Sequence, residues 1–380
     1  MVYETGFGDK SNKLQLGREA RLVRSQRADA LDYEREEYVQ DILMPLVSIG
    51  ANPDDGLFLG GGFRLVKQGF KVTPFKWRHQ VLASYALKTG AYRLTYKGRV
   101  NQALGRNDLG LDAGLFAPDH NFNFFGFGNR TERPADVKLF RYRLDMIDVK
   151  PYVERRFGPS QRVRLQGRWL SAGQGRLLAP IEGSAELAEQ SEVDYAGAAL
   201  SYALENVDAV NDPGRGVRFH AEVDAHRELE RGRDLFGAGA ELTFYFPLEW
   251  LGPRSVFALR AAGYRRDGEV DPVLARSIGG NEQVRGMRRN RFTGNSSAFG
   301  NAELRVDLFR ARNAAVPFKV GLTAFADAGR VWVDGLHEHF WHSAVGGGLY
   351  ISPLNMLVIN ASYAVSDDDR VFDLRLGFFF

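Results

Sequence analysis

Cysteine is absent from the 380 residues, which excludes disulfides, thiolate zinc sites and cysteine nucleophiles. Long apolar runs are also missing, because no stretch approaches the roughly 18 to 20 apolar residues that a membrane-spanning helix needs. A strong charge of one sign is absent too, since 50 Lys and Arg stand against 47 Asp and Glu. The sequence therefore excludes a helical membrane protein, and its near charge balance gives no field that favours nucleic acid as a partner.

Catalytic signals are equally scarce. Serines and histidines are too scattered for a hydrolase triad. His337, His339 and His342 have metal-like spacing in HEHFWH, but we place them on a solvated outer loop, so we predict no metal, no cofactor and no enzyme activity. Residues 1–15 lack the apolar region of a secretion signal, and we expect a mature form, a fragment or an engineered start.

What the chain has in abundance is alternation with a period of two. Val217, Phe219, Ala221 and Val223 form one face of a strand whose other face carries charged residues such as Arg218 and Glu222. A charged face of this kind cannot enter a dry core. The pattern continues from Pro45 to the last residues, interrupted by Gly, Pro, Asn and Asp. Residues 1–44 are instead polar and charged, which predicts a linker or tail before a barrel at 45–380.

Sixteen such segments can be placed. They are 56–69, 77–88, 91–101, 106–117, 136–146, 148–157, 160–171, 191–204, 215–227, 234–247, 254–266, 297–309, 317–329, 342–352, 355–365 and 370–380. An even number of antiparallel strands closes without a free edge, and tilted segments of about 9 to 13 residues can cross a bilayer. We therefore predict an all-β fold, a transmembrane antiparallel β-barrel of about 16 strands. The alternative, a soluble β-sandwich or propeller, would have shorter strands.

The order of the segments predicts which connections lie at which end. With the first residues on the periplasmic side, connections after even-numbered strands lie on the inner side, where short turns are expected. Most connections agree with this rule. The exception is PDHNFNFFGFGNRTERP, residues 118–134, which is long for an inner turn.

The connection between predicted strands eleven and twelve carries an unusual insert, SIGGNEQVRGMRRNRF, residues 277–292. Its glycines leave the backbone free to turn back on itself, so the insert can fold into the lumen. A guanidinium buried there, such as that of Arg285, would need a carboxylate, and Glu303 and Asp327 face the lumen on the next two predicted strands. The alternative is a solvated outer loop. Arg288, Arg289 and Arg291 are candidate contacts for lipid phosphate or lipopolysaccharide, or else part of the lumen lining.

These segments resemble a known family. GGNEQVRGM, GNAELRVDLF, FADAGRVW and the last strand up to Phe380 resemble the bacterial surface antigen superfamily, the barrels of outer-membrane assembly factors and two-partner-secretion transporters. The resemblance implies that the loop motif Val284, Arg285, Gly286 and Met287 enters the lumen. It also implies that Arg285 pairs with Asp327, with Glu303 nearby, and that Phe378 and Phe380 form the terminal-strand signal. Met287 departs from the Phe or Tyr that is usual in the family.

The first half resembles a narrower branch. PLVSIGANPDDGLFLGGGF, HQVLASYALKTGAYRLTYKG and NFNFFGFGNRTE are similar to barrels fused behind a calcineurin-like metallophosphoesterase. The Gly-Asn-His-Asp/Glu motif of such enzymes does not occur in the chain, so the hydrolase is expected to be missing.

The family resemblance implies a location in the outer membrane of a Gram-negative bacterium, among its lipids and lipopolysaccharide. The function it implies is insertion of unfolded barrel clients or export of a passenger polypeptide. The route would be a weak seam between the first and last strands, with Gly60, Gly61 and Gly62 weakening pairing there. The alternatives are a membrane anchor for the absent phosphoesterase and a small-solute channel.

Overall fold

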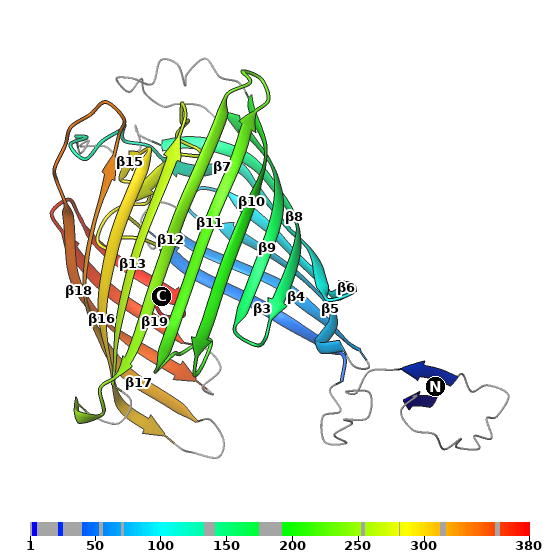
Figure 1. Cartoon of the computed structure of the whole chain (residues 1–380). Coiled ribbons are helices and arrows are strands. Elements are labelled where there is room, and N and C mark those ends of the chain that lie inside the picture. The colour runs from blue at the N-terminus through cyan, green and yellow to red at the C-terminus, as the bar shows by residue number, and fades with distance from the viewer. Residues whose placement is uncertain are drawn as a thin grey trace.

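The fold is seen in a computed structural model that describes most of the chain. The described residues are 2–5, 22–25, 40–52, 56–69, 72–132, 141–174, 192–251, 255–280, 282–311, 317–353 and 358–380. Within them, sixteen strands form one closed barrel (Figure 1). The barrel strands are β3 (Ile42–Asn52), β4 (Gly56–Gly69), β5 (Val72–Ala86), β6 (Tyr92–Leu104), β7 (Asn107–Asn123), β8 (Arg141–Phe157), β9 (Gln161–Gln174), β10 (Glu192–Val207), β11 (Gly216–Glu228), β12 (Asp234–Pro247), β13 (Val256–Asp267), β16 (Ser296–Ala311), β17 (Phe318–Trp332), β18 (His342–Pro353), β19 (Ile359–Ser366) and β20 (Arg370–Leu376).

Within the described ranges, few elements lie outside the barrel. The short strands β1 (Val2–Thr5) and β2 (Leu22–Ser25) pair in parallel, and β14 (Arg276–Ile278) pairs with β15 (Phe292–Gly294) inside the insert. A single 3-10 turn, η3 (Glu249–Leu251), connects β12 to β13 in the described part of the chain. None of the described helical residues forms a helix long and apolar enough to cross a membrane. Of the predicted tail, β1, β2 and residues 40–44 are described, and β3 already begins at Ile42.

Each strand presents one face outward and one face to the lumen, as the alternation predicts. On β11, Val223 is 53% exposed on the outside while Asp224, its neighbour, is 6% exposed on the inside. The inward charges pair across strands: Arg164 contacts Glu154 at 2.7 Å and Arg168 contacts Asp148 at 2.9 Å. Apolar residues therefore cover the outer wall, and ion pairs line the interior.

The barrel closes weakly at one place. Strand β3 pairs with β4 along its whole length, from Ile42 to Asn52. On its other side, β3 meets β20 at one register pair, Leu374 with Ala51. We call the junction of β3 and β20 the seam.

The count of sixteen strands is confirmed. One observed strand was not predicted, and two predicted segments form a single strand, so the two differences cancel in the count. Strand β3 was not predicted, because residues 1–44 were interpreted as a tail and the first strand was placed at 56–69. Pro45 is the fourth residue of β3, and proline is tolerated on a strand that borders a weak edge. The predicted segments 136–146 and 148–157 are one strand, β8, whose alternation continues through Asp148 without interruption. The predicted first strand, with Gly60, Gly61 and Gly62, is therefore the second strand of the barrel and does not form the seam.

This correction removes the conflict in the predicted topology. Strand β7 runs to Asn123, so the long connection after it joins the fifth and sixth barrel strands. It lies at the same end of the barrel as the insert, where it pairs with Thr293. A connection that follows an odd-numbered strand lies on the outer side of the membrane, where long loops are expected.

Candidate functional site in the barrel lumen

The insert, residues 268–295 between β13 and β16, folds inward and contacts opposite parts of the barrel wall. At one side, Leu274 packs in a buried cluster with Leu170 of β9 and Leu235 of β12. At the other, Arg291 donates to Asp368 in the β19–β20 turn at 2.8 Å. The insert thus crosses the lumen, and the solvated-loop alternative does not hold for its described residues.

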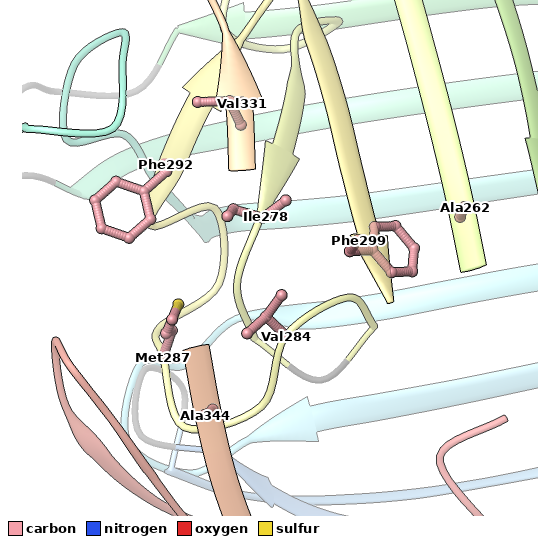
Figure 2. Packing of buried hydrophobic residues seen from close by; sticks show 8 residues of the cluster. All are labelled: Ala262, Ile278, Val284, Met287, Phe292, Phe299, Val331 and Ala344. Atoms are coloured by element: carbon pink, nitrogen blue, oxygen red, sulfur yellow. The ribbon is translucent and has the colours of Figure 1, made fainter. Parts of the chain in front are cut away.

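The middle of the insert is anchored by apolar side chains (Figure 2). Val284 and Met287 are 0% and 1% exposed. Met287 therefore buries itself where an aromatic residue is usual in the resembling family, and a flexible thioether can fill an irregular gap. The cluster contains Ala262, Ile278, Val284, Met287, Phe292, Phe299, Val331 and Ala344.

Gly286 permits the close approach of this loop to the wall. Its φ of +78° is in the left-handed region, and a Cβ there would lie 3.3 Å from both Ala364 and Ser366. The Ser366 hydroxyl donates to the Gly286 carbonyl at 2.7 Å. A larger residue would be strained in its backbone and crowded against β19.

Arg285 lies at the centre of a buried ion network. Its Nε and Nη2 donate to the two carboxylate oxygens of Asp327, each at 2.8 Å, and its main-chain N–H donates to Asp327 at 3.0 Å. Its Nη1 donates to Glu303, which also accepts from Nε of Arg305 at 2.8 Å. Its guanidinium lies 3.5 Å from the ring centre of Phe325. The structure thus brings together the three residues grouped from the sequence and adds Arg305 and Phe325.

Burial of this network is tolerable because its charges balance. Arg285, Glu303, Arg305 and Asp327 are each 5% exposed or less, and they comprise two cations and two anions. A buried ion is costly unless paired in good geometry, and the bidentate contact of Arg285 with Asp327 is such a geometry. The network links the insert to β16 and β17.

The three arginines proposed from the sequence as phosphate contacts differ from one another. Arg291 is 3% exposed and bound to Asp368, with Thr131 also accepting from its Nη1 at 2.7 Å. Arg288 lies 3.5 Å from Asp369. Arg289 is exposed. Of the three candidates for phosphate contact, Arg289 is the one whose side chain is most open to solvent.

A second loop that sequence reasoning did not assign to the site packs beside the insert. It follows β7 and contains Phe124 and Phe125, which are 2% and 4% exposed. Asn129 docks it onto β17: its Nδ2 donates to the carbonyl of Val331 at 2.8 Å, and its Oδ1 accepts from the Val331 N–H at 3.0 Å. The Asn129 amide thus makes the two main-chain hydrogen bonds that a neighbouring strand would make with Val331. The FFGFGN run signalled an unusual loop, but nothing local indicated its partner 202 residues away.

We expect Asn129→Ala to loosen this loop. Val331 is fully buried, so its N–H and C=O would lose their side-chain partner, at a cost of about 1 to 3 kcal/mol for each unsatisfied group. Limited proteolysis of the purified barrel should cut the loop faster, with Asn211→Ala, an exposed asparagine at the other end, unchanged. Equal cleavage of both variants would contradict the docking role.

The histidine motif does not form a metal site. His342 is 3% exposed, its Nδ1 lies 2.9 Å from Asp367, its Nε2 lies 3.1 Å from the Asn129 carbonyl, and it stacks on Phe292. The predicted solvated loop is therefore wrong for His342, because the ring ties the second loop to the wall. No group of three or more His, Cys, Asp or Glu in the described ranges could hold a metal ion.

One phosphoesterase-like spacing, Asp-x-His, occurs on β11. His226 Nδ1 lies 2.8 Å from Asp224, and Asp224 also accepts from Arg266 at 2.7 Å. Both side chains lie on the lumen face, where the guanidinium of Arg266 pairs with the carboxylate of Asp224. The pair forms part of the lumen charge lining.

The fold and the lumen insert define the class of the protein: a sixteen-stranded antiparallel barrel of the outer-membrane type, with an arginine-bearing loop anchored inside it. A model described as "Omp85 superfamily domain" matches residues 60–380. The chain belongs to the Omp85 superfamily, as the sequence motifs suggested.

Solved structures share the fold at low sequence identity. BamA from Haemophilus ducreyi lacking POTRA domains 1-3 aligns with a TM-score of 0.63 and 12% identity, over 89% of this chain and 70% of that one. CdiB from Escherichia coli gives 0.58 and 12%, over 88% and 63%. CdiB from Acinetobacter baumannii gives 0.53 and 15%, over 89% and 60%. No curated protein matches the chain.

Proposed function

We propose that the chain handles polypeptides in the outer membrane of a Gram-negative bacterium, by inserting unfolded barrel clients or exporting a passenger. The observation that carries the proposal is the seam, where β20 meets β3 at a single register pair. Unpaired N–H and C=O groups are costly in lipid, and an incoming client strand would satisfy them. Such strand addition uses the backbone and therefore accepts many client sequences.

The lumen contents favour this function over a small-solute channel. The insert crosses the lumen from β9 to the β19–β20 turn, and the second loop packs beside it. A channel needs an open path, whereas a strand-exchange route at the wall does not. The partners in this proposal are client or passenger polypeptides and outer-membrane lipids, with Arg289 available to a lipopolysaccharide phosphate. No residue is assigned to catalysis, and no nucleic acid or cofactor is required.

Reconstituted folding of a client barrel tests the proposal. Liposomes that contain the protein are expected to fold an added urea-denatured barrel at least about tenfold faster than empty liposomes, because the seam lowers the barrier to strand pairing in lipid. The heat-modifiable gel mobility of the client reports its folding. A matched rate in both preparations would favour the membrane-anchor function, which is the role of the barrels fused to metallophosphoesterases that the first half of the chain resembles.

A further inference from the structure

The charges of the barrel strands are not evenly distributed around the wall. Strands β3, β4, β5 and β6 lie side by side, and β3 borders the seam (Figure 1). Together these four strands contain seven Lys and Arg residues and no Asp or Glu. The other twelve barrel strands contain nineteen Lys and Arg and nineteen Asp and Glu. The near balance of the whole chain therefore conceals a strongly cationic sector beside the seam.

Strand register shows which side chains of this sector face the lumen. Arg99 pairs with Glu154 at 2.7 Å, and Glu154 belongs to the ion pairs that line the interior. Lys97 lies two residues before Arg99 on β6, so it shares that face. Arg78 is the register partner of Arg99 and faces the lumen from β5. Both Lys97 and Arg78 therefore project into the interior.

Arg64 on β4 joins them in the same part of the wall. It is the register partner of Gln80, which is in turn the partner of Lys97. The three cations Arg64, Arg78 and Lys97 thus lie on three adjacent strands, and we call them the cationic face. Arg93, further along β6, is left out of this set because the opposite charges of Glu282 and Arg289 in the insert both act on it.

The three cations of the cationic face have no carboxylate partner among the described residues. Of the seven Lys and Arg in this sector, Lys67 and Arg99 are the ones in salt bridges within those residues. Arg64 donates to the neutral amide of Gln80 at 2.9 Å. Lumen cations on β9, β11 and β13 are instead paired with carboxylates.

The nearest carboxylates are already engaged. Glu154 contacts both Arg99 and Arg164, each at 2.7 Å. Asp112 stands opposite Lys97 in the register, but its carboxylate lies 3.6 Å from Arg164. The wall next to the cationic face therefore has no spare anion to offer it.

This arrangement does not favour the stability of the barrel by itself. Arg78 stands directly opposite Arg99, and like charges at opposed positions of adjacent strands repel. Positions that break a rule of stability are expected where a protein binds something. The cationic face thus indicates a ligand that supplies the missing negative charge.

The insert leaves the cationic face accessible. Among the described elements, the insert strands β14 and β15 contact β13, β16 and β17. The apolar residues of the insert reach β9, β12 and β18, and Arg291 reaches the β19–β20 turn. Lys97 is exposed, and Arg64 and Arg78 are partly exposed. A ligand in the lumen can therefore reach all three side chains.

The spacing of the three cations suits an extended chain. Arg64 and Lys97 lie in one row of the sheet, and Arg78 lies in the next row, two residues along the strands. Such rows are about 7 Å apart, and an extended polypeptide repeats the side chains of one face at the same interval. Asp or Glu at every second position would therefore meet successive rows. A phosphate group offers its charge at one point and matches only one row.

We propose that the cationic face binds an acidic polypeptide segment in extended conformation. The carboxylates of such a segment supply the partners that Arg64, Arg78 and Lys97 lack, whereas a lipid acyl chain carries no charge for them. A client strand that enters at the seam would turn its lumen-facing side toward this sector. The client as the source of the segment rests on the proposed function, but the binding of acidic segments does not.

Peptide binding to the full chain in a neutral detergent tests this assignment. The probe is a fluorescently labelled peptide of about twelve residues with alternating Glu and Thr, long enough to cross both rows. The control peptide carries Gln in place of each Glu. Anisotropy should show that the Glu peptide binds at least about tenfold more tightly. Raising the salt from about 0.05 M to about 0.5 M should remove most of this preference, because the contacts are screened.

The decisive variant is Arg78→Gln with Lys97→Gln. It should weaken binding of the Glu peptide about tenfold. Its unfolding midpoint in urea should stay the same or rise, because neighbouring like charges are removed and no carboxylate loses a salt bridge. The matched control is Lys150→Gln with Arg162→Gln, which removes two lumen cations that are paired with Asp148 and Glu205. Binding to this control should stay within about twofold.

Three results would overturn the assignment. They are equal binding of the Glu and Gln peptides, an equal loss of binding in both double variants, and displacement of the Glu peptide by inorganic phosphate at the same concentration of anionic groups. The last result would make the ligand a phosphate. Selective peptide binding without faster client folding would leave the cationic face standing and refute the proposed function instead.

Discussion

A disulfide across the seam is expected to abolish client folding. Cysteines at Ala51 and Leu374 would stand at the one register pair that joins β3 to β20, and registered antiparallel residues have α-carbons close enough for a disulfide. The chain contains no other cysteine, so any bond formed is this one. We expect oxidation to remove at least about nine-tenths of the acceleration of client folding, because the strand edges can no longer separate to accept a client strand. Reductant should restore it.

A matched staple elsewhere separates seam opening from a general effect of cross-linking. Val223 and Ala238 are register partners on β11 and β12, which pair along most of their lengths. Cysteines at these positions should form a disulfide without any loss of activity. If the seam staple forms completely and client folding continues at its normal rate, lateral opening is excluded as the route.

The sequence predicted the barrel because alternation is a local property of each strand. The two opposite faces of a strand, such as those of Val223 and Asp224, can be identified from neighbouring residues alone. Most strand bounds agree with the structure within a few residues. The seam could not be located in this way. Strand β3 begins inside the predicted tail, at Ile42. The loss of pairing between β3 and β20 depends on how the whole sheet closes, which no single strand records.

The site shows the same division. The pairing of Arg285 with Asp327 was expected from the family resemblance. It was also expected because Glu303 and Asp327 stand at lumen-facing positions of their predicted strands. The second loop was not expected, because Asn129 contacts Val331 across 202 residues. The end of the last strand was also missed, since GFFF continues the alternating pattern. Strand β20 ends at Leu376 and Gly377 turns the chain with φ of +96°, so Phe378 and Phe380 do not lie in the last strand.

Arg285→Ala is expected to cause the largest loss of stability of any single substitution in the insert. The change would leave Asp327, 3% exposed, without the cation that binds both of its oxygens. Breaking a buried pair by removing one partner costs about 3 to 5 kcal/mol. Urea unfolding followed by heat-modifiable mobility should show this loss. Arg168→Ala, which breaks a more exposed lumen pair with Asp148, should cost about 1 kcal/mol.

A double variant identifies the cause of that loss. If the orphaned charge is responsible, Arg285→Ala with Asp327→Asn should be more stable than Arg285→Ala alone, because a neutral amide costs less to bury than a carboxylate. Glu303 needs no change, since Arg305 still pairs with it at 2.8 Å. Two losses that simply add would mean that Arg285 and Asp327 act independently. A recovery of stability in the double variant would show that the Arg285–Asp327 pair, more than the apolar cluster around Val284, holds the insert in position.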